Sequence, residues 1–188
     1  MNIGFAICGS FCTFSSVFAA MENLAHTHQI TPIFSHSAYT IDSRFGSAQG
    51  HIARAEEICK NKVIHTIEQA EPIGPKKLLD ALVIAPCTGN TLAKLAHSIA
   101  DGPVTMAAKS HLRNGRPIVI AVSTNDGLAG AAENIGRLLA RKHYYFVPFG
   151  QDDPINTPTS MVADFTKIPQ ALEAALEGRQ IQPVLLQN

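Results

Sequence analysis

The sequence is poor in charge, because only 16% of its 188 residues are Asp, Glu, Lys or Arg, against about 25% in an average domain. Fifteen basic side chains balance fifteen acidic ones and no basic run occurs, which excludes the electrostatic footprint of a nucleic-acid-binding protein. So little charged surface indicates that part of the surface is buried between subunits. We therefore expect a homo-oligomer with no nucleic-acid partner.

Long hydrophobic runs are missing as well. The longest apolar stretches fall short of the ~20 residues that a membrane-spanning helix needs. Residues 1–5 carry no basic leader and are typical of a first strand rather than an export signal. The four cysteines form no CxxC pair and have no metal-type spacing with histidine, which predicts a cytoplasmic chain with no metal site and no membrane partner.

Short apolar segments alternate with longer amphipathic ones along the chain. With 46% hydrophobic residues, this length suits one domain over residues 1–188. Strands that are apolar throughout must be covered on both faces. The pattern predicts a single Rossmann-like α/β domain, a doubly wound parallel sheet of about six strands with helices on both faces. The expected strands are 2–8, 31–35, 62–65, 81–85, 116–122 and 144–149.

Residues 150–160 are rich in proline and follow no clear period. Irregular loops of this length are uncommon unless they have a function or are disordered. We expect an irregular lid or subunit-contact arm here.

Small polar residues follow four of the expected strands, at 9–13, 35–37, 86–91 and 123–126. In a parallel sheet these positions lie at the carboxyl edge, where ligands bind and helix N-termini favour anions. The alternative is that the Ser, Thr and Asn side chains only cap the following helices. Four such segments together favour a neutral ligand crevice.

The type of ligand is narrowed by what the loops lack. The first loop has a single glycine, Gly9, instead of GxGxxG, and the second strand ends in Ser35 rather than an acidic residue. No lysine-containing phosphate loop of the Walker type is present. NAD binding in the usual mode and ATP hydrolysis are therefore disfavoured, and flavin mononucleotide (FMN) fits a neutral crevice with apolar walls.

Gly9-Ser10 and the segment 85–94 (APCTGNTLAK) resemble the flavin-binding pattern of the FMN-containing cysteine decarboxylase superfamily. Within it, segments 43–46, 70–77, 112–114, 123–126 and 149–154 are most similar to the family of dipicolinate synthase B subunits. The resemblance implies that Ser10 and Ser35 lie near the FMN phosphate. It implies trimers or larger assemblies. The cofactor contacts implied are Gly9, Ser10, Ser35, Pro86, Thr88, Asn90, Thr91 and Ser123.

The sequence also departs from that superfamily. Its decarboxylases carry a histidine at the position of about Pro72 and a P-x-M-N segment where this chain reads 122–125 (VSTN). Its flavin prenyltransferases carry an arginine near the position of Ser123. Both groups are absent, which disfavours both activities.

The resemblance therefore implies an FMN subunit that acts with an A subunit carrying the NAD(P) site. Together they would oxidise a dihydrodipicolinate-type precursor to dipicolinate in sporulation. We expect Arg44 and Arg113 to neutralise the substrate's two carboxylates and Asn125 to contact substrate or flavin. Each residue also has an alternative interpretation. Asn125 would only cap the following helix, Arg113 would only interact with the C-terminus of its own helix, and Arg44 would be a solvated loop residue. Alternative functions are a non-catalytic assembly subunit and an FMN-dependent decarboxylase of a small carboxylic acid.

Overall fold

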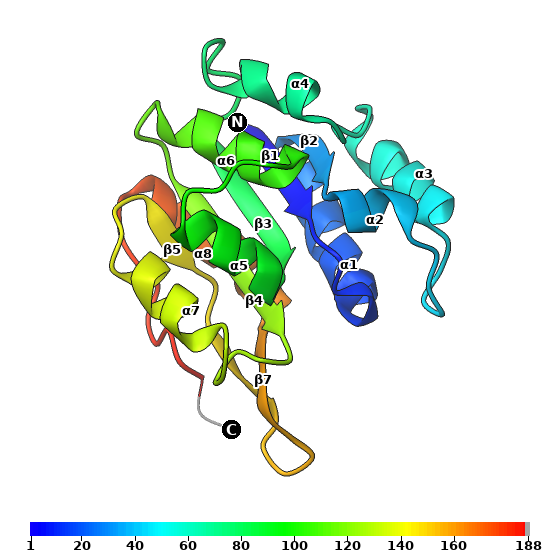
Figure 1. The fold of residues 1–188 in the computed structure, drawn as a ribbon. Helices are drawn as coiled ribbons and strands as arrows, with labels where there is room; N and C mark the ends of the chain where they lie inside the picture. Colours follow the sequence, from blue (N-terminus) through cyan, green and yellow to red (C-terminus); the bar gives the residue numbers. More distant parts are fainter. Residues whose placement is uncertain (187–188) are drawn as a thin grey trace.

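A computed structural model describes residues 1–186 and contains one seven-stranded sheet in that range (Figure 1). The strand order is β2-β1-β3-β4-β7-β6, and β5 pairs with the first half of β4. The strands are β1 Asn2–Ile7, β2 Gln29–Phe34, β3 Ala81–Cys87, β4 Ile118–Thr124, β5 Tyr144–Phe146, β6 Phe149–Asp153 and β7 Thr157–Ala163.

The continuous apolar runs of the sequence form the centre of the sheet. All of β3 is buried, as are β1 beyond its first residue and β4 before its last. These strands run parallel, in register from Leu82 opposite Ile118 to Ile84 opposite Ile120. This confirms the predicted α/β fold, with one strand more than the six expected.

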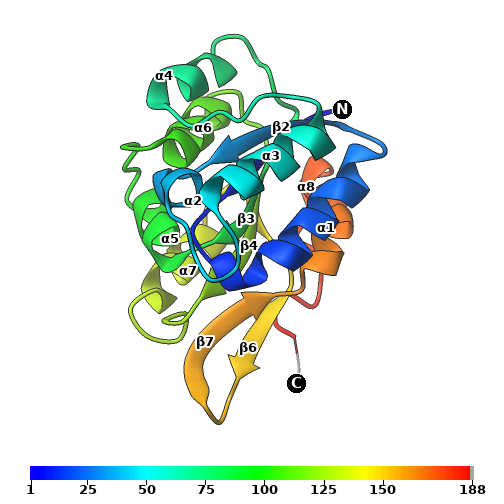
Figure 2. The ribbon, with the colours of Figure 1, turned by 90° about the vertical axis from the view of Figure 1, so that its right-hand side faces the viewer.

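Helices cover both faces of the sheet (Figure 2). On one face lie α5 (Gly89–Ala96), α6 (Pro103–Leu112) and α7 (Ala132–Leu139). The other face carries α1 (Phe14–Ala25) and α8 (Ile168–Leu176). The β2 edge is flanked by α2 (His36–Thr40) and α3 (Ala48–Cys59), and the short α4 (Ile67–Ala70) contacts α6. Single-turn helices occur at Phe11–Thr13, Glu71–Ile73 and Phe165–Lys167.

Two of the predicted elements are wrong. Segment 62–65 makes only an isolated bridge, Ile64 with Ile33, because a run this short adds no full strand at the sheet edge. Segment 150–160 is not irregular: β6 and β7 form an antiparallel hairpin. At its turn a carboxylate oxygen of Asp153 accepts bonds from the amides of Ile155 and Asn156, at 3.0 and 2.9 Å. These bonds lower the pKa of Asp153 below its usual value.

The hairpin projects from the carboxyl edge of the sheet (Figures 1 and 2). Its second strand pairs antiparallel with the end of β4, through Ser123 with Val162 and Thr124 with Met161. The hydroxyl of Thr159 donates to the carbonyl of Asn125 at 2.7 Å, which fixes the turn after β4 against the hairpin. The hairpin therefore forms one wall beside the strand ends.

A buried histidine lies on α6, next to the residue that precedes β4. The His111 side chain is fully buried on α6, and its Nε2 lies 3.1 Å from the carbonyl oxygen of Pro117. Its Nδ1 has no hydrogen-bond partner in the described residues. Burial is the main reason that the pKa of His111 falls from 6.5 to about 4.

No helix within residues 1–186 combines the length and the apolar character that a membrane span requires.

Candidate functional site

The polar segments that follow β1, β2, β3 and β4 meet at the carboxyl edge of the sheet, where they line two adjoining cavities. The larger cavity has a volume of about 880 Å³ and the smaller one about 470 Å³. Four residues line both and form the wall between them: Gly9, Phe11, Thr88 and Asn90. The sequence prediction that these segments converge is therefore confirmed in geometry.

The larger cavity is enclosed by the loop after β1, the turn after β4, the 43–45 loop and the β6–β7 hairpin. Phe11, Met161 and Val162 give it apolar surface, and Ser10 and Ser123 give it hydroxyl groups. Such a mixture of apolar walls and few polar groups is typical of a pocket for a small organic ligand.

The smaller cavity collects the N-termini of three helices. Its lining includes Ser35, His36 and Ser37 at α2, Thr88 and Thr91 at α5, and residues 102–105 at α6. The positive ends of three helix dipoles therefore face one space, which favours an anion there.

The hydroxyl groups at the strand ends differ in what they bind. Ser35 accepts a hydrogen bond from the amide of Ala38 and Thr88 accepts one from that of Thr91, so both cap their helices. The Oγ atoms of Ser10 and Ser123 are instead 2.8 Å apart, joining the loop after β1 to the end of β4. The capping alternative thus holds for two of the four segments, and the other two hydroxyls bridge the sheet edge.

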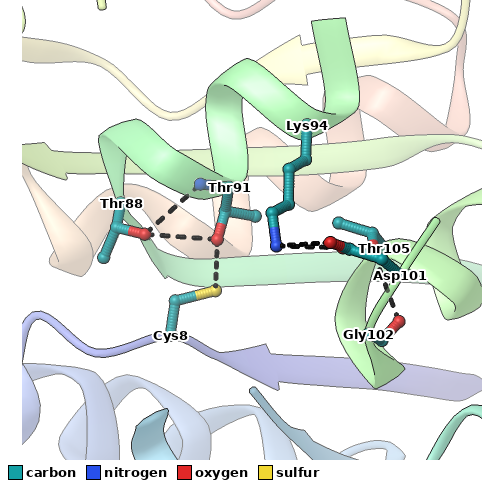
Figure 3. Close-up of polar contacts among 7 residues, drawn as sticks. All are labelled: Cys8, Thr88, Thr91, Lys94, Asp101, Gly102 and Thr105. Atoms are coloured by element: carbon teal, nitrogen blue, oxygen red, sulfur yellow. Dashed lines mark hydrogen bonds and ion pairs between the residues drawn. The ribbon is translucent and has the colours of Figure 1, made fainter. Parts of the chain in front are cut away.

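Beneath this wall lie two buried thiols. The hydroxyl of Thr91 donates to Sγ of Cys8 at 3.3 Å (Figure 3). Burial raises the pKa of Cys8 to about 11 and that of Cys87 well above its usual value. Both cysteines are therefore neutral packing groups at physiological pH.

Lys94 in α5 forms an ion pair with Asp101, with Nζ 2.9 Å from Oδ1 (Figure 3). Both residues line the smaller cavity. The bond from the ammonium lowers the pKa of Asp101 below its usual value. Since Asp101 neutralises Lys94, the attraction for an anion in this cavity comes mainly from the helix N-termini.

The larger cavity is not the uncharged space that the sequence predicted, because three charged residues line it. The guanidinium of Arg44 lies 4.8 Å from the centroid of the Phe45 ring, and the carboxylates are those of Asp126 and Asp152. Asp126 accepts a hydrogen bond from the hydroxyl of Thr124. Arg44 is the one cation among the described residues that line this cavity, which suits it to hold a ligand carboxylate.

Three sequence predictions about site residues need correction or refinement. Arg113 ends α6 and lines a different cavity, so Arg44 and Arg113 do not share a site within this chain. Pro86 is buried within β3 and lines neither cavity; its carbonyl accepts a bond from the amide of Cys8 at 3.3 Å. Asn125 lines the larger cavity and does not cap α7, whose N-cap residue is Ala131.

The sequence reasoning missed the contribution of the hairpin. Asp152, Met161 and Val162 line the larger cavity because β7 pairs with the end of β4. The signal that could have predicted the hairpin is the Asp153-Pro154-Ile155-Asn156 run, a turn sequence in which an Asp side chain bonds the following amides.

A mainly parallel sheet with polar loops around two cavities at its carboxyl edge is the architecture of an α/β protein with a ligand site at the strand ends. The chain belongs to the flavoprotein family, whose model matches residues 1–163. It is 43% identical to the B subunit of dipicolinate synthase from Bacillus subtilis (strain 168), over all of this chain and 94% of that protein.

Solved structures agree with this assignment. The crystal structure of the dipicolinate synthase B subunit from Bacillus halodurans C superposes with a TM-score of 0.91 at 44% identity, over 100% of this chain and 96% of the other. DmrB of Burkholderia xenovorans in complex with FMN has the same fold, with a TM-score of 0.68 at 16% identity, covering 94% and 95% of the two chains.

Proposed function

We propose that this chain is the FMN-binding B subunit of a two-subunit dipicolinate synthase, which oxidises a dihydrodipicolinate-type precursor to dipicolinate during sporulation. The whole-length similarity to B subunits of dipicolinate synthase supports this interpretation. A partner A subunit would carry the NAD(P) site, since this chain lacks a dinucleotide fingerprint. The observation that carries the proposal is the two-part site, in which an anion-favouring cavity adjoins a larger one with apolar walls.

The residues present fit an FMN molecule that spans both cavities. Gly89 lets the first turn of α5 approach the turn after β4 closely, because a Cβ there would lie 2.7 Å from Oδ1 of Asp126 and 2.8 Å from Oγ1 of Thr124. At Gly9 a Cβ would lie 3.2 Å from that of Ser37, so the missing side chain lets the loop after β1 lie close to α2. The wall that the two cavities share, formed by Gly9, Phe11, Thr88 and Asn90, carries no charged side chain.

The charge distribution favours one orientation. The phosphate would lie in the smaller cavity, held by Ser35, the backbone at Gly9 and the first turns of α2 and α5. The ring would lie in the larger cavity against Phe11, beside Ser10 and Ser123. Ser10 then serves the ring side, because it lines the larger cavity alone.

The substrate would bind beside the ring, in the larger cavity. Arg44 would hold one carboxylate with two parallel hydrogen bonds, and Asn125 would contact the substrate at the mouth. The acidic Asp126 and Asp152 would repel a dianion from the rest of the cavity, which leaves Arg44 as its binding position. Bound FMN would supply a two-electron acceptor at this place.

The decarboxylase alternative gains no support from the geometry. Among the described residues that line the larger cavity, no histidine is present to move a proton. Pro72 stands at about the position where the decarboxylases of the superfamily carry a histidine. It lies in the short helix Glu71–Ile73 and lines neither cavity.

We also propose a cytoplasmic homo-oligomer, a trimer or higher. The sparse charge supports it, as do apolar side chains left exposed on the single chain, such as Ile155 (89% exposed) at the hairpin tip and Leu128 (52%). Light scattering of the purified chain tests this, and a monomer at micromolar concentration would contradict it.

The activity is tested by mixing the purified chain with its A subunit, FMN, NAD(P)⁺ and a dihydrodipicolinate-type substrate. We expect dipicolinate, measured by its ultraviolet absorbance, only when both subunits and FMN are present. Full-rate production by either subunit alone would contradict a shared site. Production of dipicolinate by the two subunits without flavin would favour the alternative, in which this chain is a non-catalytic assembly subunit.

A further inference from the structure

A separate cavity, which we call the α5–α6 hollow, is lined by the end of α5, the segment that follows it, α6 and the start of β5. Its volume is about 410 Å³, within the ~300–1,000 Å³ range of small-molecule pockets. Leu95, Ile99 and Leu112 give it an apolar lining. Its cations are Lys94, which is paired with Asp101, and Lys109 and Arg113. No Asp or Glu lines it within the described part of the chain.

Lys109 and Arg113 are four positions apart and so lie on the same side of α6. Neither side chain makes a hydrogen bond or ion pair with any residue from 1 to 186. A position near the C-terminus of a helix would account for two cations by itself. Helix C-terminal charge does not explain why Lys109 and Arg113 line a pocket together with apolar side chains and Tyr144 of the sheet.

The second observation is Tyr144, the first residue of β5, which lines the hollow from the sheet side. The residue is only 8% exposed, and its hydroxyl has no hydrogen-bond partner among the described residues. The hydroxyl oxygen itself is not fully buried, so it is open to water or to a ligand in the hollow and can donate a hydrogen bond there. Burial raises the pKa of Tyr144 above its usual value, so this group is a neutral donor at physiological pH.

We propose that the α5–α6 hollow binds a small carboxylate with an apolar body, of the benzoate class. The carboxylate would lie between Lys109 and Arg113, the hydrocarbon part on Leu95 and Leu112, and a polar atom within reach of the Tyr144 hydroxyl. The small volume favours such a ligand over a segment of polypeptide. This site is separate from the proposed flavin site, although Lys94 and Thr105 line both the hollow and the smaller cavity.

The test is calorimetric titration of the full chain with benzoate, with and without saturating FMN. We expect saturable binding in both arms. Acetate, which lacks the apolar body, and benzyl alcohol, which lacks the charge, should bind at least about tenfold more weakly.

Variants locate the site. The double substitution Lys109→Gln with Arg113→Gln should weaken benzoate binding by about tenfold or more, and Tyr144→Phe by several-fold, with FMN affinity unchanged. Lys76→Gln removes an exposed cation outside the hollow and should change nothing. Absence of saturable binding, or equal binding by the double variant, would overturn the proposal. So would a change of oligomeric state in the double variant without benzoate binding, because the hollow would then be an interface. Failure of FMN to bind would contradict the proposed function and leave this inference intact.

Discussion

The buried His111 predicts a loss of stability in mild acid. Its pKa is about 4 in the folded chain against 6.5 when exposed, so the unfolded chain binds a proton more readily. The contribution is present in full above pH 6.5 and is lost as the pH falls from 6.5 toward 4. From these two values the loss is about 2 kcal/mol between pH 7 and pH 5, and about 3 kcal/mol in total.

The structural reason is the unpartnered ring nitrogen. Nε2 lies 3.1 Å from the carbonyl oxygen of Pro117 and donates to it in the neutral ring, which leaves Nδ1 as the atom to be protonated. A proton there would be buried without an acceptor. His111→Gln keeps an amide donor and removes the titration.

The assay is urea unfolding of wild type, His111→Gln and the exposed control His26→Gln at pH 7 and pH 5. We expect the wild type and the control to lose about 2 kcal/mol more than His111→Gln between the two pH values. An equal pH dependence in His111→Gln and wild type would refute the reasoning.

Three further predictions concern packing and the site. Gly74→Ala should lower stability by about 1–3 kcal/mol in thermal unfolding, because its Cβ would lie 2.4 Å from the backbone oxygen of Ser110. The matched Gly136→Ala in α7, with nothing within 4 Å of the new Cβ, should raise it by up to ~1 kcal/mol; equal effects would contradict the contact argument. Arg44→Gln should raise KM for the substrate at least about tenfold with FMN affinity unchanged, measured in the two-subunit assay, and an unchanged KM would remove Arg44 from the substrate site. Ser35→Ala should cost about 1 kcal/mol of stability through the lost α2 cap and also weaken FMN binding; a stability loss alone would make Ser35 only a cap.

The centre of the fold could be predicted from sequence because β1, β3 and β4 are apolar on both faces and alternate with amphipathic segments, a pattern typical of a parallel sheet covered by helices. The convergence of the polar loops followed from the same reasoning, since parallel strands bring their carboxyl ends to one edge. The hairpin could not be predicted from periodicity, because the end of β6 and the start of β7 are polar and largely exposed, and Pro158 interrupts β7.

Arg113 shows a different limit. Segment 112–114 matched the resemblance, but the direction in which the end of a helix faces depends on how α6 packs on the sheet. The side chain therefore lines the α5–α6 hollow rather than the cavity that holds Arg44. Charge complementarity with a dicarboxylate predicts an arginine at the substrate, but it does not predict how α6 packs.

The central claim is that the strand-end loops form one site for one FMN molecule. The most direct measurement is a titration of the purified chain with FMN, followed by flavin fluorescence, for wild type and for Gly89→Leu, whose side chain would displace Asp126 and Thr124 in the lining of the larger cavity. The account predicts saturable binding of one FMN per chain in the wild type and a loss of at least about tenfold in affinity in the variant. No FMN binding by the wild type, alone or with its partner subunit, or equal binding by Gly89→Leu, would contradict it.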